Sequence, residues 1–137
     1  WVEGQRRARR AVAAAFADRG YDVEEDATVT GPSGTDRYLH VYASDALLDE
    51  RVAVAVHELP LVEHIERLQA NAADLDARPV LVSTVGTVSA AVAERAEREG
   101  VTVLSVTDDG DVVREYDVTE DLTSDPSLLQ RITTVLT

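Results

Sequence analysis

The chain has no cysteine and no lysine, and aromatic residues make up only 4% of its 137 residues. The lack of cysteine excludes disulfides and thiolate metal sites, and it leaves the redox compartment open. No apolar run approaches the ~20 residues that a membrane-spanning helix needs, and no signal-peptide pattern opens the sequence. We therefore expect a cytoplasmic protein. Its length fits one compact domain over residues 1–137, which could belong to a longer chain because the sequence begins at Trp1.

Acidic residues dominate the charged residues of the chain. There are 26 aspartates and glutamates against 13 basic residues, all of them arginine, which gives a formal net charge of −13. Such a charge on a small domain repels itself in dilute salt, whereas in multimolar salt the Debye length falls below about 3 Å and screens the repulsion. The composition resembles that of cytoplasmic proteins from salt-accumulating (halophilic) microbes. An acidic face that binds a basic partner is the alternative.

Four of the arginines are concentrated in the first half of an expected helix over Gln5–Arg19, at Arg6, Arg7, Arg9 and Arg10. Positive charge near a helix N-terminus opposes the macrodipole, so helix stability does not explain these residues. Contact with nucleic-acid phosphates is one explanation, and ion pairing with the protein's own acidic surface or with a protein partner is the other. The cluster is therefore the candidate surface for nucleic-acid or partner contact.

The stretch between Gly34 and Glu58 predicts two strands joined by a polar connection. In the first strand, alternation puts side chains on two opposite faces, with Asp36, Tyr38, His40 and Tyr42 on one and Leu39, Val41 and Ala43 on the other. The second strand, Val52–His57, is apolar on both faces, as expected for a strand covered on two sides. Asp36 enters the first strand and His57 ends the second, so we expect these two side chains to lie next to each other at one end of a sheet.

Periodicity and turn residues predict further elements in an order that indicates an α/β fold. The expected helices are Gln5–Arg19, a second from Pro60 to about Leu75, Val88–Glu99, and a last one that Asp125 and Pro126 open. The further strands are expected at Tyr21–Thr30, Val80–Thr84, Val101–Val106 and, as an edge strand, Val112–Val118. The order α-β-β-β-α-β-α-β, followed by a strand and a helix, predicts a mixed β-sheet flanked by helices. The apolar face of the last helix either packs on this sheet or contacts another subunit.

Short motifs accompany this order of elements. A helix leads to Gly20-Tyr21-Asp22-Val23, a glycine-rich turn ends in Gly34-Thr35-Asp36, and a buried strand ends in Val54-Ala55-Val56-His57. Together with the strand and the alanine-rich helix downstream, over roughly Gln5 to Val106, they resemble the restriction-endonuclease-like (PD-(D/E)xK) superfamily, most closely its Mrr-like nuclease domains. The resemblance implies a restriction-endonuclease-like mixed β-sheet with an αβββαβαβ core, and it places the catalytic aspartate at Asp36.

The departures from the family pattern fall on the catalytic residues. The resemblance implies that Mg²⁺ lies between Asp36 and a second oxygen ligand, and that a lysine helps to activate water. Ala55 stands where the second ligand belongs and cannot bind a metal, and His57 stands in the place of the lysine. Glu3 could approach from the first helix as the missing ligand, while Glu58 alternates to the opposite face of its strand from His57.

We therefore expect a catalytically degenerate domain that acts as a binding or structural module in a protein or nucleoprotein assembly, without a cofactor. Its partner would be another protein or a second copy of the chain, and nucleic acid would contact the arginine cluster. The alternative is an active Mg²⁺- or Mn²⁺-dependent DNA endonuclease. In that case Asp36 holds the metal with Glu3 or Glu58, and His57 acts on water or on the leaving oxygen.

A transition-metal site is a third hypothesis. Asp36, His40 and His57 could converge, and imidazole nitrogens favour softer metals than magnesium. The remaining histidine, His64, is expected on the exposed side of its helix, where it would be solvated.

Overall fold

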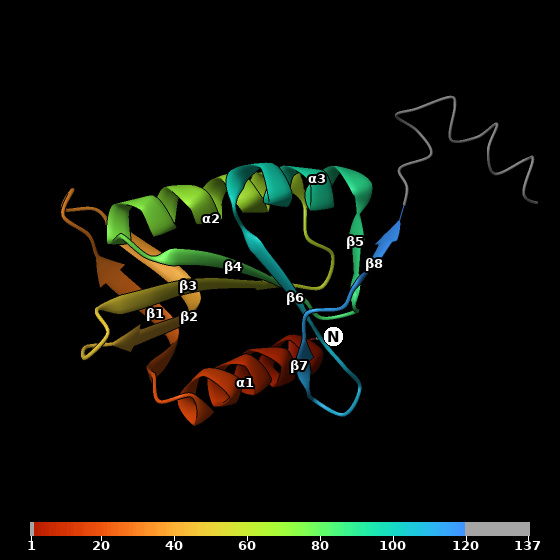
Figure 1. Ribbon diagram of the computed structural model, residues 1–137, viewed down its shortest axis with the longest axis horizontal. Helices are drawn as coiled ribbons and strands as arrows, with labels where there is room; N and C mark the ends of the chain where they lie inside the picture. The colour runs from red at the N-terminus through yellow and green to blue at the C-terminus, as the bar shows by residue number, and fades with distance from the viewer. Residues whose placement is uncertain (1, 120–137) are drawn as a thin grey trace, which may run out of the picture.

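Three helices and eight strands make up the part of the chain that the computed structural model describes, residues 2–119 (Figure 1). The helices are α1 (Val2–Asp18), α2 (Val62–Leu75) and α3 (Ala90–Glu99). The strands are β1 (Asp22–Thr30), β2 (Asp36–Asp45), β3 (Glu50–His57), β4 (Arg78–Ser83), β5 (Thr87–Ser89), β6 (Thr102–Val106), β7 (Val112–Val113) and β8 (Asp117–Thr119). The last helix that the sequence predicts, at Asp125, lies outside these residues. Over the same range, no helix has the length and apolar character needed to cross a membrane.

Six of the strands form one mixed sheet in the order β1-β2-β3-β4-β6-β7. Strands β3, β4 and β6 are parallel to one another, whereas β1, β2 and β7 pair with their neighbours in antiparallel fashion. The short strands β5 and β8 form a separate parallel pair. The α/β fold with a mixed sheet flanked by helices, which the sequence predicts, is therefore confirmed.

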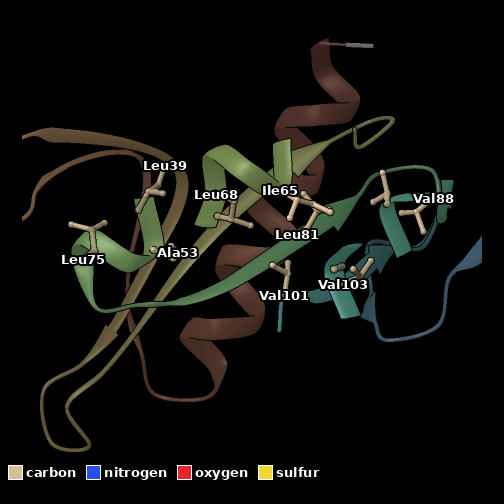
Figure 2. Close-up of a cluster of buried hydrophobic side chains, with 12 residues drawn as sticks. Leu39, Ala53, Ile65, Leu68, Leu75, Leu81, Val88, Val101 and Val103 are labelled. Carbon is tan, nitrogen blue, oxygen red and sulfur yellow. The ribbon is translucent and has the colours of Figure 1, made fainter. Parts of the chain in front are cut away.

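The helices cover both faces of the main sheet, with α2 and α3 on one face and α1 on the other (Figure 1). The crossovers β3–α2–β4 and β4–α3–β6 advance in the same direction across the sheet. Because such crossovers have the same handedness, they place α2 and α3 on the same face. Figure 2 shows the core beneath α2 and α3, which includes Leu39, Ala53, Ile65, Leu68, Leu75, Leu81, Val88, Val101 and Val103. The core beneath α1 consists of Ala8, Val12, Ala13, Val41, Ala43, Val52, Val54, Val56, Val80 and Val82.

The hairpin formed by β1 and β2 bends at Asp26 and His40. The two strands pair in one register on either side of this point, but the pairing omits these two residues. Asp26 has a left-handed backbone with φ of 50°, a conformation that aspartate tolerates better than most residues. Beyond the bend the faces are exchanged, so that Val41 packs beneath α1 and Leu39 beneath α2. The prediction that Leu39 and Val41 share a face is therefore wrong.

The outer half of this hairpin is attached to α2. Arg37 Nε donates a hydrogen bond to Asp74 Oδ2 at 2.9 Å, and the Ser33 hydroxyl donates to the same oxygen at 2.8 Å. A Cβ atom on Gly31 would meet the Asp74 carboxylate, so the glycine lets the turn after β1 approach the helix while this carboxylate keeps its position. These contacts hold the bent part of the hairpin against α2.

Two predicted helix starts are wrong by two residues each. Helix α2 begins at Val62, and Pro60 is instead buried in the connection that precedes it. Helix α3 begins after Ser89, whose side chain accepts a hydrogen bond from the Val92 amide and thereby caps the helix. Val88 is buried as expected, but it belongs to β5.

The predicted edge strand Val112–Val118 is divided between two sheets. Strand β7 pairs with the end of β6 and forms an edge of the main sheet, whereas β8 pairs with β5. The Ser105 hydroxyl donates to the Glu115 carbonyl at 2.5 Å, and the Asp117 amide donates to the Gly86 carbonyl at 2.8 Å. These two bonds direct the chain from one sheet to the other, which local sequence periodicity does not reveal.

Truncation of Leu81 tests the larger core. Leu81 lies in the central strand β4 and is 0% exposed, whereas Leu47 in the β2–β3 turn is 96% exposed. Leu81→Ala leaves a cavity, so we expect the free energy of unfolding to fall by about 2–5 kcal/mol. Leu47→Ala is the control and should change it by less than about 0.5 kcal/mol. Urea denaturation at constant salt measures both variants, and equal effects would contradict the packing described above.

Candidate functional site

The three histidines of the chain lie together at the end of the sheet where β3 stops. The ring centroids of His40 and His57 are 5.2 Å apart, and those of His57 and His64 are 3.6 Å apart with an interplanar angle of only 3°. Tyr38 extends this row, with its ring centroid 5.8 Å from that of His40. The expectation that His64 is solvated is wrong, because the start of α2 places its ring on that of His57.

The side chain of His40 lies where β2 and β3 separate. Regular pairing of these strands ends at Val41 and Val54, and beyond it the Val56 amide donates to Nδ1 of His40 at 2.7 Å. The imidazole thus replaces a backbone carbonyl, and Nδ1 is unprotonated because it accepts this hydrogen bond. The Val56 carbonyl accepts from Gln5 Nε2 of α1 at 3.0 Å. Side chains from two elements therefore satisfy the polar backbone groups at the end of β3.

Burial favours the neutral form of these imidazoles. It lowers the pKa of His40 from 6.5 to about 4, and the Arg9 guanidinium acts in the same direction. It lowers the pKa of His57 to about 3, and the two neighbouring imidazoles add to the effect. Burial also lowers the pKa of His64, whose Nδ1 accepts a hydrogen bond from the Leu61 amide at 2.9 Å. At neutral pH the histidine cluster is therefore uncharged.

Two hollows share the rings of His57 and His64. The first has a volume of about 160 Å³ and is lined by Tyr38, Leu39, His40, Val54, Ala55, His57, His64, Arg67, Leu68 and Asn71. The second has a volume of about 370 Å³ and is lined by Gly4, Gln5, His57, Glu58, Leu59, His64, Thr84 and Val85. Both open near the carboxyl ends of parallel strands, where ligands of α/β proteins commonly bind. The first hollow is called the histidine pocket below.

An ion pair joins α1 to the bend of the hairpin beside the histidine pocket. The Arg9 guanidinium contacts the Asp26 carboxylate, and the Tyr38 hydroxyl donates to the same carboxylate oxygen at 2.7 Å. The Arg9 side chain is only 17% exposed. Arg9 therefore fixes the position of Tyr38 through Asp26, and its charge opposes protonation of His40.

The residues predicted to hold a metal do not meet in this pocket. Asp36 is exposed at the start of β2, opposite Thr30, whose hydroxyl donates to it at 2.6 Å. It lies at the same end of the sheet as His57, but Tyr38 and His40 are the polar β2 side chains that share the pocket with His57. Glu58 lines the second hollow. Asp36 therefore lies at the predicted end of the sheet but does not line the histidine pocket that contains His57.

The described residues contain no metal-binding group of side chains. None of them forms a cluster of three or more histidine, aspartate or glutamate side chains that could hold an ion. The transition-metal site expected from Asp36, His40 and His57 is therefore not formed by the described residues, because Asp36 does not line the pocket that holds the two imidazoles. The side chain of Glu3 lies outside the structural description.

The N-terminal arginines fall into two kinds. Arg9 pairs with Asp26, whereas Arg6, Arg7 and Arg10 are exposed and form no ion pair with the described residues. Pairing with the protein's own acidic surface therefore explains Arg9. The other three guanidinium groups face solvent on α1, where a partner could reach them.

The histidine pocket combines hydrogen-bonding groups with an apolar floor. Neutral imidazoles, Arg67 and Asn71 supply the hydrogen-bonding groups, and no carboxylate of the described side chains lines the pocket. The part that α2 plays in the pocket was not predicted from the sequence. A signal was present in His64, which is the third residue of α2, a position from which a side-chain acceptor reaches back to the amide that precedes the helix.

No protein-family model and no curated protein sequence matches the chain. The fold is similar to a solved structure described as "Crystal Structure of Protein of Unknown Function AF1548", with a TM-score of 0.55 and 16% sequence identity. The similarity covers 72% of this chain and 58% of that one, so the chain spans less than two thirds of its structural neighbour. The comparison supports the α/β fold.

Acidification from pH 6.5 to pH 5 should destabilise the protein. Histidines of the unfolded chain take up protons near pH 6.5, whereas folded His40 and His57 remain neutral until about pH 4 and about pH 3. The free energy of unfolding should therefore fall as the pH falls, by up to about 1.4 kcal/mol per pH unit for each histidine. Urea denaturation at fixed ionic strength measures the slope.

The variant His57→Phe is the matched comparison, because it removes one titrating group and keeps an aromatic ring against His64. Its stability should depend less steeply on pH than that of the unmodified chain. Ring NMR signals of the histidines report each pKa directly. A folded-state pKa near 6.5 for His40 or His57 would contradict the burial described here.

Proposed function

We propose that the domain is a catalytically degenerate relative of the restriction-endonuclease-like nucleases, and that it serves as a binding module in a protein or nucleoprotein assembly. The sequence motifs support this ancestry, and so does the position of the pocket. Ala55 and His57, which stand where the resemblance requires an acid and a lysine, both line the histidine pocket. The observation that carries the proposal is that Ala55 lies in this pocket and that no acidic side chain among the described ones lines it in its place.

The missing acid removes the means of holding a divalent cation. Magnesium requires oxygen ligands in near-octahedral geometry, and a single exposed carboxylate such as Asp36 holds it poorly. His57 cannot replace the lysine electrostatically, because its pKa of about 3 keeps it neutral at physiological pH. Neither metal activation of water nor stabilisation of a phosphorane charge is then provided.

The exposed arginines of α1 support contact with an acidic partner. Arg6, Arg7 and Arg10 face solvent without an ion-pair partner among the described residues, although the chain carries twice as many acidic as basic residues. Affinity that depends on phosphate contacts falls steeply with salt, so it would be weak in a salt-loaded cytoplasm. We therefore favour a protein partner or a second copy of the chain, with nucleic acid as a further component of the same assembly.

A plasmid-cleavage assay tests the absence of catalysis. We expect no nicking or linearisation with Mg²⁺ or Mn²⁺ in high KCl, and no rise in the melting temperature when either ion is added, because the pocket lacks an acidic ligand. An active nuclease assayed in the same buffer serves as the positive control.

Cleavage that disappears in the variant Asp36→Ala would overturn the proposal in favour of an endonuclease that uses Asp36 and His57. In that case the ion would be held at the exposed start of β2, outside the histidine pocket. Cleavage that Asp36→Ala leaves unchanged would instead indicate a contaminating nuclease.

A second experiment separates the two kinds of partner. DNA-binding anisotropy with a labelled duplex is measured at about 0.1 M and about 2 M KCl, and self-association is followed by sedimentation under the same conditions. We expect weak DNA binding that is lost at the higher salt. In the variant Arg6→Gln/Arg7→Gln/Arg10→Gln, the slope of log affinity against log salt concentration should decrease in magnitude by about one for each phosphate contact removed. Arg98→Gln, on α3, controls for the loss of a single positive charge away from α1. DNA binding that persists at 2 M KCl would contradict the preference for a protein partner.

A further inference from the structure

The face of the main sheet beneath α1 is only partly covered in the described residues. A helix is about 10 Å wide, whereas neighbouring strands are about 4.8 Å apart, so one helix cannot shield a sheet of six strands. Helix α1 packs mainly against β1 and β2, and it makes fewer contacts with β3, β6 and β7. This leaves a hollow between the C-terminal half of α1 and the edge of the sheet at β7.

The hollow has a volume of about 170 Å³, an apolar floor and a basic rim. Its floor is formed by Val52, Val80, Leu104, Val112 and Val113, with the rings of Phe16 and Tyr21 at one side. The two rings meet edge to face with centroids 5.5 Å apart, and the Tyr21 hydroxyl donates to Glu50 at 2.5 Å. The Glu50 carboxylate is therefore the hydrogen-bond partner of the Tyr21 hydroxyl.

Three arginines surround this floor: Arg19, Arg78 and Arg114. All three are exposed, and none forms an ion pair with the described residues. The carboxylates near Arg78 have other partners, since Asp49 and Asp76 contact Arg51 and Glu50 accepts the hydrogen bond of Tyr21. In a chain with twice as many acids as arginines, three unpaired guanidinium groups around one hollow need a reason.

The position of one of the three arginines is explained by the C-terminal end of α1. Arg19 follows the last turn of α1, where a positive charge is stabilised by the helix dipole. Arg78 begins β4 and Arg114 follows β7, so neither lies at the end of a helix. Their shared feature is the hollow that they line.

We propose that this hollow binds a small amphipathic organic anion, with a single apolar ring against the floor and a carboxylate or phosphate group between the arginines. An apolar cavity of about 150 Å³ accommodates a benzene-sized ring, which matches the volume found here. Guanidinium groups bind carboxylates and phosphates through paired hydrogen bonds. The site lies on the opposite face of the sheet from the histidine pocket, and it does not depend on the function proposed for that pocket.

The test is a titration with benzoate and phenyl phosphate, followed by ¹H–¹⁵N NMR at the lowest KCl concentration at which the protein stays folded. We expect shifts of the amide signals of β6 and β7 and of Tyr21, while the signals of His57 and His64 stay unchanged. Benzyl alcohol and inorganic phosphate serve as controls, because each supplies only half of the required chemistry. Both should bind at least about tenfold more weakly than phenyl phosphate.

Charge-removing variants locate the anion. Arg78→Gln and Arg114→Gln should each weaken phenyl phosphate binding by roughly three- to tenfold. Arg98→Gln is the matched control, since it changes the net charge equally at an exposed position on α3, and it should leave the affinity unchanged. Any one of four results would overturn the proposal: benzyl alcohol binds as tightly as phenyl phosphate, inorganic phosphate does so, the NMR shifts are confined to the histidine pocket, or Arg78→Gln and Arg114→Gln have no effect.

Discussion

The bend at Asp26 and His40 is the constraint on which the rest of the structure depends. There the hairpin of β1 and β2 turns its outer half toward α2, and β2 separates from β3. The separation opens the histidine pocket, and the imidazole of His40 accepts the hydrogen bond that the Val56 amide would otherwise give to a strand. The contact of Arg9 with Asp26 at one side and that of Arg37 with Asp74 at the other hold the bend.

The two faces of the sheet follow from the way the strands are connected. Both crossovers place their helices on one face, and within residues 2–119 only α1 covers the other. The better covered face carries the larger core and the histidine pocket, while the face beneath α1 retains a basic hollow near β7. Uneven coverage thus gives the domain two chemically different surfaces, one with neutral imidazoles and one with guanidinium groups.

Local patterns in the sequence predicted most of the elements but not how they meet. Apolar periodicity is sufficient for α2 and for the buried strands β3, β4 and β6, because it depends on residues close in the chain. The bend could not be found in this way, since strict alternation assumes a straight strand and therefore put Leu39 with Val41. The same assumption paired Asp36 with His57. The stacking of His64 on His57 depends on where α2 begins, which the burial of Pro60 shifts by two residues.

Strands β1 and β7 form the two edges of the main sheet, and they are protected in different ways. Strand β7 has only two residues, which is too short to template another strand at any ionic strength. Strand β1 has nine, and its deterrent is the charge of exposed acids such as Asp22, Glu24 and Glu25. Concentrated salt weakens that repulsion without changing the length of β7. Among the described strands, concentrated salt therefore weakens the protection of the β1 edge and leaves that of the β7 edge unchanged.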